Sequence, residues 1–226
     1  MKRERNYLFV FILAVCIVLS NVGKTYAASG TCEIYYFTYE GAVGEGGSAS
    51  IQSYLGNVGY TVNRYADVHA YYVRRTMNSD KVFVIVAHGV PGRILCKDGI
   101  TTLSASQVPT DDNNYSLEAW FSANDLNGML FAYYGACYSA TTDSTYGNLL
   151  TYTTGTLGAN CALGFSTSVS DTHATYYETC LFEALGNGDT VLVANNVAMT
   201  LTYFKYNSYG NINSAVISGN ANISID

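Results

Sequence analysis

The stretch Lys81-Val-Phe-Val-Ile-Val-Ala-His88-Gly89 carries an unbroken apolar run directly into a histidine. A second stretch, Met129-Leu-Phe-Ala-Tyr-Tyr-Gly-Ala136-Cys137, repeats the pattern and ends on a cysteine. A continuous apolar run bounded by glycine is typical of a strand that is buried on both faces of a parallel sheet. Because ligands bind outside the carboxyl ends of such strands, the two stretches predict that His88 and Cys137 meet.

Apolar runs and helical patterns alternate on the amino-terminal side of this histidine. The alternation of strand, helix, strand, helix and strand predicts a mostly parallel sheet with helices on both faces. Strands are expected over residues 33–39, 60–64 and 81–87, with helices over 48–55 and 67–77, the second opening on Asp67 as an acidic cap.

The residues after His88 predict a small hairpin that covers the site. Lys97-Asp98-Gly99 separates two short apolar runs, and an Asp-Gly pair in that position favours a tight turn. Farther along, we expect helix in part of 117–126 and around 146–152, a strand over 161–165, helices over 172–185 and 189–204, and a last strand over 214–218.

The amino terminus has the pattern of a Sec-type signal peptide. Lys2-Arg3-Glu4-Arg5 precedes an apolar core over residues 7–19, and Thr25-Tyr26-Ala27 follows as the cleavage region. A membrane span is the alternative, but crossing a bilayer takes about 20 apolar residues and this run breaks at Ser20-Asn21. Removal of residues 1–27 leaves residues 28–226, which suffice for one domain with a sizeable core.

The charge balance argues against nucleic-acid binding. The chain has 11 Lys and Arg residues against 17 Asp and Glu, a net charge of −6, and the predicted signal peptide holds four of the basic residues. The low charged fraction of 12% and the 21 tyrosines suit an extracellular protein with a weakly charged surface. We therefore expect secretion, with no membrane attachment after signal cleavage.

Five cysteines follow the predicted cleavage site, and an odd number in a secreted chain leaves at least one thiol unpaired. We expect this thiol to be Cys137. The other four could form two disulfides in three connectivities or could all stay reduced: Cys32, Cys96, Cys161 and Cys180. No Cys-x-x-Cys occurs and the three histidines lack ligand spacing, so we expect neither a metal nor another cofactor.

The order of a strand ending in His-Gly and a later strand ending in Ala-Cys resembles the caspase-like (clan CD) cysteine peptidases. That clan includes caspases, clostripain, gingipains, legumain, separase and the bacterial CHAT domains. The resemblance covers nearly the whole mature chain. It rests on residues 82–89, the hairpin at 97–104, residues 130–137, and residues 162–171, which look like the CHAT pattern. It implies a three-layer α/β sandwich and a bacterial, secreted peptidase closest in pattern to CHAT or clostripain-like domains.

Thiol-based peptide hydrolysis needs a thiolate, a group that moves protons, and fixed donors for the oxyanion. The resemblance implies that Cys137 is the nucleophile that forms a thioester and that His88 is the acid and base, a role that suits a side chain titrating near neutrality. It also implies that the backbone N–H groups of Gly89 and Cys137 form the oxyanion hole. Glycine at position 89 fits, because a scissile carbonyl can approach the main chain without meeting a Cβ.

The substrate preference stays open in the sequence. Relatives that cleave after basic residues commonly carry an acid two positions before the nucleophile, where this chain has Gly135. Asp171, expected at the end of a neighbouring strand, could supply a negative pocket floor instead, and Ser166 could favour a neutral side chain. A peptide or protein substrate is expected, with Gly135, Ser166 and Asp171 as candidate binding residues. Ser139 stands where caspases have a glycine, which puts the geometry of the oxyanion loop in question.

Two other functions remain as alternatives. One is a caspase-like secreted binding module without catalysis, because a buried cysteine is commonly only a core residue. The other is an α/β-hydrolase-type esterase, since residues 135–139 approach a nucleophile elbow but lack its second glycine. That triad would have to use Asp171 and His173, which are only two residues apart. The oligomeric state is not determined by the sequence.

Overall fold

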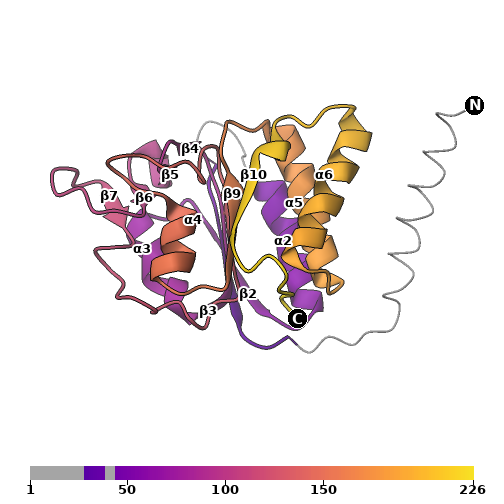
Figure 1. The fold of residues 1–226 in the computed structure, drawn as a ribbon, viewed down its shortest axis with the longest axis horizontal. Helices are drawn as coiled ribbons and strands as arrows, with labels where there is room; N and C mark the ends of the chain where they lie inside the picture. Colours follow the sequence, from indigo (N-terminus) through magenta and orange to yellow (C-terminus); the bar gives the residue numbers. More distant parts are fainter. Residues whose placement is uncertain (1–27, 39–43) are drawn as a thin grey trace, which may run out of the picture.

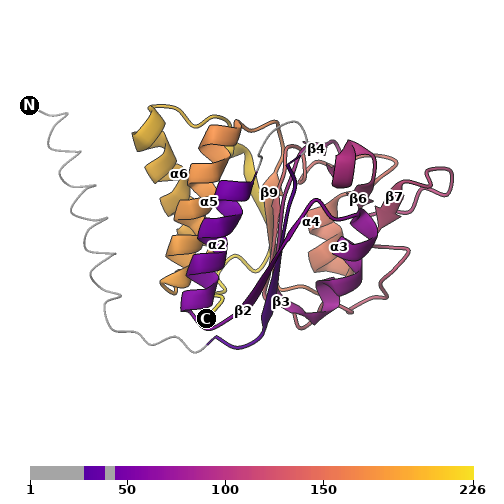
Figure 2. The same cartoon turned by 180° about the vertical axis from the view of Figure 1, so that it is seen from behind.

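The structure is a computed structural model that describes residues 28–38 and 44–226. The predicted signal peptide lies outside the described residues. Figures 1 and 2 show three layers, with a central sheet seen nearly edge-on between two groups of helices. No described helix combines the length and the apolar content needed to cross a lipid bilayer.

The central sheet has six strands in the order β10-β9-β8-β3-β1-β2. Neighbouring strands are parallel except for β10, which runs antiparallel to β9 at one edge. The central strands β8 and β9 are buried along their whole length, as their unbroken apolar runs predict. The strands are β1 (Thr31–Tyr36), β2 (Thr61–Ala66), β3 (Asp80–Val86), β8 (Phe131–Gly135), β9 (Cys161–Phe165) and β10 (Ala215–Gly219).

Helices cover both faces of this sheet, which confirms the expected α/β sandwich. Successive residues of a strand point to opposite faces, so Tyr133 packs into the core on one side and Tyr134 into the core on the other. Helices α2 (Glu45–Asn57), α5 (Asp171–Gly186) and α6 (Val191–Tyr206) lie on one face, and α3 (Ala70–Thr76) and α4 (Leu149–Thr151) on the other (Figure 1).

A small second sheet follows β3 directly in the chain. Its order is β4 (Gly89–Val90), β5 (Arg93–Leu95), β6 (Thr102–Ser104) and β7 (Asn114–Ser116). Strands β5 and β6 are antiparallel, which confirms the predicted hairpin. The turn contains Gly99 at φ 67°, a left-handed conformation that glycine adopts without steric cost. His88 therefore stands at the junction between the two sheets.

Helix α3 begins later than the sequence predicts. The expected acidic cap at Asp67 is wrong, because His69 is the N-cap and its Nδ1 accepts the N–H of Tyr71 at 3.2 Å. The Asp67 carboxylate instead accepts the backbone N–H and the hydroxyl of Thr38, at 2.7 and 2.6 Å. A competing partner just beyond the neighbouring strand β1 thus removes Asp67 from the helix.

The expected helix within residues 117–126 is also wrong, since this segment consists of turns. The N–H groups of Asn124 and Leu126 donate to the carbonyls of Thr156 and Leu157, at 3.0 and 2.8 Å. Pairing with a distant segment replaces the bonds that a helix would make within itself. The helix expected over 146–152 is short as well: α4 starts after Asn148 and continues as the π-helical turn η3 (Tyr152–Thr156).

Candidate active site

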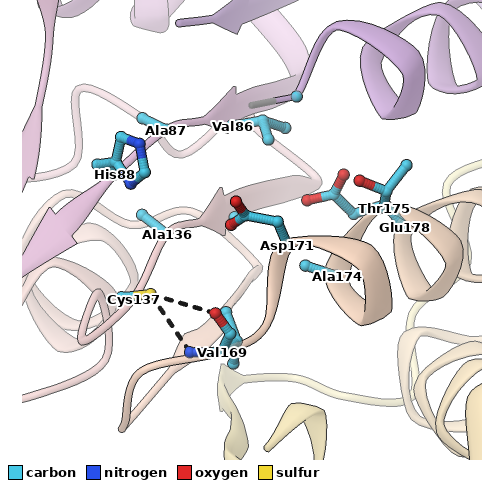
Figure 3. Close-up of a pocket in the computed structure, with 12 residues that line it drawn as sticks. Val86, Ala87, His88, Ala136, Cys137, Val169, Asp171, Ala174, Thr175 and Glu178 are labelled. Carbon is cyan, nitrogen blue, oxygen red and sulfur yellow. Dashed lines mark hydrogen bonds between the residues drawn. The ribbon is translucent and has the colours of Figure 1, made fainter. Parts of the chain in front are cut away.

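His88 and Cys137 leave neighbouring strands at the same level of the sheet. Strands β3 and β8 pair in parallel with Val86 opposite Gly135, and each reactive residue lies two positions beyond its member of that pair. The Ala87 N–H extends the pairing by donating to the Gly135 carbonyl at 3.1 Å. Both His88 and Cys137 line one pocket, on the side away from α5 (Figure 3). The structure thus brings together the two side chains that the sequence singled out.

Gly89 holds the loop after β3 directly against the loop after β8. A Cβ atom at position 89 would lie 2.1 Å from the carbonyl oxygen of Cys137 and 3.1 Å from the Cβ of Ala136. The nearest atom belongs to the backbone and cannot rotate away. Only glycine allows this approach, which sets the Gly89 and Cys137 main chains side by side.

The Cys137 thiol is half-buried and lies against the loop that precedes α5. The Val169 N–H donates to Sγ at 3.3 Å, and the thiol faces the Val169 carbonyl oxygen at 3.7 Å (Figure 3). The Ser168 hydroxyl lies 3.8 Å from Sγ. The pocket therefore presents a sulfur that is partly accessible and held against the Val169 backbone.

The other four described cysteines have a different environment. All five are free thiols in the structure, but the four are buried, and burial raises their pKa values. They are Cys32, Cys96, Cys161 and Cys180. Cys137 is thus the described thiol best exposed for reaction. No three His, Cys, Asp or Glu side chains gather as metal ligands within the described ranges.

The chain turns sharply after Cys137 and is then fixed by a buried hydroxyl. Tyr138 has φ 59°, an unusual value for a bulky side chain, and its N–H donates to Thr167. Ser139 is fully buried, donates to the Tyr134 carbonyl at 2.8 Å and accepts the Phe165 N–H at 3.0 Å. The serine that replaces the caspase glycine thus links β8 to β9 and is not one of the residues that line the pocket.

Helix α5 forms the opposite wall of the pocket. Its contribution is a stripe of residues spaced for one helical face: Asp171, Ala174, Thr175 and Glu178. Gly135 also lines the pocket, so two of the three predicted substrate-binding residues are there. Ser166 is exposed elsewhere and donates its hydroxyl to the Ser214 carbonyl at 3.1 Å.

Glu178 is the one ionisable residue among the described pocket residues that the sequence did not single out. Its side chain is buried, and the Tyr133 hydroxyl donates to Oε1 at 3.2 Å. Burial is the main cause that raises the pKa of Glu178 to about 8; the Tyr133 bond opposes it and the charge of Asp171 adds to it. The signal available in the sequence was an acid seven positions after Asp171, within an otherwise apolar helix face.

His173 is not one of the residues that line this pocket. Its Nδ1 lies 3.0 Å from the Ser170 hydroxyl, and its ring packs on Tyr206 with 4.5 Å between centroids. A Cβ on Gly210 would overlap the same ring. His173 therefore packs against the end of α6, which counts against an esterase triad built from Asp171 and His173.

Comparison with known proteins identifies the fold of this chain but no sequence family. No family model and no curated protein matches the chain. Among solved structures, the Arg-specific cysteine proteinase gingipain R is similar with a TM-score of 0.56 and 11% identity over 86% of this chain and 47% of that one. A complex of the pro- and mature domains of RgpB from Porphyromonas gingivalis gives 0.59 and 12%, over 92% and 52%. This chain thus spans about half the length of the gingipain chains.

A third solved structure matches over nearly its whole length. Caspase-1 from Spodoptera frugiperda is similar with a TM-score of 0.53 and 13% identity, over 87% of this chain and 92% of that one. A yeast separase–securin complex from Saccharomyces cerevisiae gives 0.52 and 14%. The chain therefore has the caspase-like fold, which its structural neighbours among the cysteine peptidases share.

Proposed function

We propose that this protein is a cysteine endopeptidase that hydrolyses peptide bonds through Cys137 and His88. One observation carries the proposal: a thiol and an imidazole leave adjacent parallel strands at the same level and line one pocket. The caspase-like fold shared with cysteine peptidases supports it. We also propose that the protein is secreted by a bacterium after signal cleavage, that residues 28–226 form one peptidase domain, and that its pattern is closest to CHAT or clostripain-like domains.

The reaction proceeds in two steps. Cys137 gives its thiol proton to His88 as Sγ attacks the scissile carbonyl carbon; the C–N bond then breaks, and His88 delivers that proton to the departing amine. A thioester then links the acyl part of the substrate to Cys137. His88 next takes a proton from water, whose oxygen attacks the thioester carbonyl carbon. The C–S bond breaks, the acid product leaves, and His88 returns the proton to Sγ.

The oxyanion in each step lies against the main chains of Gly89 and Cys137. Their close approach, which excludes a Cβ at position 89, sets the two main chains side by side, and their backbone N–H groups are the donors that the resemblance to caspase-like peptidases implies. Loss of one oxyanion donor in other enzymes costs about 10²–10³-fold in kcat. The Val169 N–H serves the resting sulfur instead, because it already points at Sγ.

Cleavage of a diverse peptide library tests this function. Wild type is expected to cut, while Cys137→Ala and His88→Ala are expected to lose at least about 10³-fold in kcat/KM, since each removes a group of the covalent pathway. A matched control is His69→Asn, which keeps a capping acceptor for α3 and should leave kcat/KM within about threefold.

Alkylation of the folded protein separates catalysis from mere binding. Iodoacetamide should label Cys137 faster than the four buried thiols, and His88→Ala should slow that labelling. Absence of cleavage by wild type together with slow, equal labelling of all five thiols would favour the binding-module alternative.

A further inference from the structure

Helix α6 presents an uncharged, largely apolar face to solvent, and it lies at the outer margin of its layer in both views (Figures 1 and 2). The face carries an aliphatic pair near its start and an aromatic pair near its end, each side chain 38% to 50% exposed: Leu192 and Val193, then Tyr203 and Phe204. The exposed positions between the pairs are Asn196 and Thr200, which are polar but uncharged. Surface helices direct charged residues outwards, so a face of this composition marks an interaction site.

The opposite face of α6 already packs into the core of its own chain. Val191, Ala194 and Ala198 are fully buried in the cluster that joins α5 and α6 to the sheet. Asn195 accepts the buried Tyr177 hydroxyl of α5 at 2.5 Å. Since the core uses this side of the helix, the outer apolar residues do not serve the packing of the domain. A helix with apolar residues on both faces is typical of one that is covered on both.

The aromatic pair is held in place by ring contacts at the surface. The rings of Tyr203 and Phe204 meet edge to face, with 6.1 Å between centroids, and Tyr203 also packs on exposed Tyr209 at 4.8 Å. Side chains that are ordered before a partner arrives lose less conformational entropy on binding. The carboxyl end of α6 thus offers a pre-organised aromatic surface.

The residues of this face are placed symmetrically about the level of Ala198. Asn196 and Thr200 lie equally far from it on either side, and the aliphatic and aromatic pairs lie beyond them, about 17 Å apart along the helix. If the same helix of a second copy is laid antiparallel on this face, the aliphatic pair of each copy meets the aromatic pair of the other. The polar residues then meet at the centre. The face is therefore complementary to itself under a twofold axis, as an isologous interface requires.

We propose that the outer face of α6 is the interface of a symmetric homodimer, in which the α6 helices of two copies pack antiparallel. One face of a 16-residue helix is at the low end of interface size, so the dimer should be weak and dissociate on dilution, with a Kd of ~1–100 μM. No residue of α6 lines the pocket beside Cys137. Each copy therefore keeps its own site, and dimerisation is independent of the proposed peptidase activity.

The distribution of charge favours a second copy over a lipid surface. Helices that lie on membranes usually carry lysine and arginine beside their apolar face. The one basic residue of α6 is Lys205, whose ammonium group lies over the ring of Tyr176 on α5, at 3.8 Å from its centroid. The whole chain has a net charge of −6, which opposes attraction to anionic lipids. Two copies, in contrast, can bury this face without placing a charged side chain between them.

Sedimentation equilibrium of the purified protein over about 1–300 μM tests the interface, and wild type should pass from monomer to dimer in this range. Phe204→Glu should raise the Kd at least about 30-fold, because the carboxylate would be buried against aliphatic side chains. Tyr72→Glu is the matched control, since this more exposed aromatic residue lies on α3, in the opposite layer; it should leave the Kd within about threefold. Both positions are exposed, so both variants should fold, and melting curves check this.

A mixture of two variants tests the antiparallel geometry. Val193→Lys alone should weaken the dimer as Phe204→Glu does. In an equimolar mixture of the two variants, the new ammonium group of one copy meets the new carboxylate of the other, while the second contact across the twofold axis keeps the native Val193 and Phe204. The mixture should therefore recover at least about tenfold of the lost affinity. In a parallel pair, position 193 would meet position 193, and mixing would recover nothing.

Several results would overturn the proposal. One is a wild-type protein that stays monomeric up to about 300 μM, whether or not intact mass shows residues 1–27 to be attached. A dimer that Phe204→Glu leaves unchanged, or that Tyr72→Glu weakens equally, would place the interface elsewhere. Binding of monomeric wild type to phosphatidylcholine vesicles, lost in Phe204→Glu, would assign the face to a lipid surface instead. Mixed variants that stay monomeric would exclude the antiparallel pairing.

Discussion

Gly89 shows how a single hydrogen atom in place of a side chain determines the distance between two loops. The Cys137 carbonyl oxygen occupies the space that a methyl group at position 89 would need. Since both sides of this contact are main chain, an added Cβ has to push the loops after β3 and β8 apart. The separation of the nucleophile from the acid and base then changes with it.

Gly89→Ala is therefore expected to lower kcat/KM by about 100-fold, the cost of misplacing reacting groups by about 1 Å. Overpacking should also reduce the free energy of unfolding by about 1–3 kcal/mol. Kinetics with the best library peptide and urea unfolding measure the two effects. Gly56→Ala is the control, since no atom lies within 4 Å of its added Cβ. Unchanged activity in Gly89→Ala would show that the loops are not held at this contact.

The Ser139 hydroxyl joins strands β8 and β9 in addition to the backbone hydrogen bonds between them. This side chain gives a hydrogen to Tyr134 and takes one from the Phe165 N–H at the end of β9. It follows the nucleophile by two residues, so it also fixes the turn that presents the thiol. Strand β8, which leads to Cys137, and strand β9, which leads to α5, are thereby held in register.

Ser139→Ala should lower the free energy of unfolding by about 1–3 kcal/mol, because it leaves the buried Phe165 N–H without an acceptor. Urea denaturation monitored by circular dichroism measures the change. Ser53→Ala, at an exposed position of α2, provides the comparison and should stay within about 0.5 kcal/mol of wild type. A Ser139→Ala protein as stable as wild type would mean that the strands do not depend on this bridge.

Two buried carboxyl groups with raised pKa values lie at opposite ends of the sheet. Asp80 begins β3 at the amino end, and Glu178 packs against β8 near the carboxyl end. The pKa of Asp80 is raised to about 8, first by burial and then by the nearby charge of Glu33; that of Glu178 is also raised to about 8. Both folded-state pKa values lie above those of an unfolded chain.

A raised pKa means that the folded protein keeps protons that the unfolded chain releases near pH 4. The stabilisation from these protons is complete below about pH 4 and is lost as the pH rises towards 8. The free energy of unfolding should therefore fall between pH 5 and pH 8, by a few kcal/mol. Asp80→Asn with Glu178→Gln should flatten this slope in urea titrations across the range. A wild-type stability that increases from pH 5 to pH 8 would contradict the assignment of protons to these two groups.

The strands were predictable because each central strand is buried on both faces and therefore reads as a continuous apolar run. The helices α5 and α6 were predictable for a related reason, since long amphipathic patterns end at clear breaks such as Gly186-Asn-Gly188. Predictions failed at Asp67 and in residues 117–126. In both places a hydrogen-bond partner far along the chain replaced the local one, and no local pattern records such a partner.

The sequence by itself determined that a histidine and a cysteine end two buried strands, because hydrophobic periodicity is a property of neighbouring residues. Only the tertiary structure decided what surrounds that pair. The Val169 N–H at the sulfur, the exposure of Ser166 away from the pocket, and the Glu178 carboxyl in the space left by Gly47 and Gly135 depend on how α2, α5 and β8 pack together. These contacts join residues tens of positions apart, and their geometry exists only once the sheet and its helices have assembled.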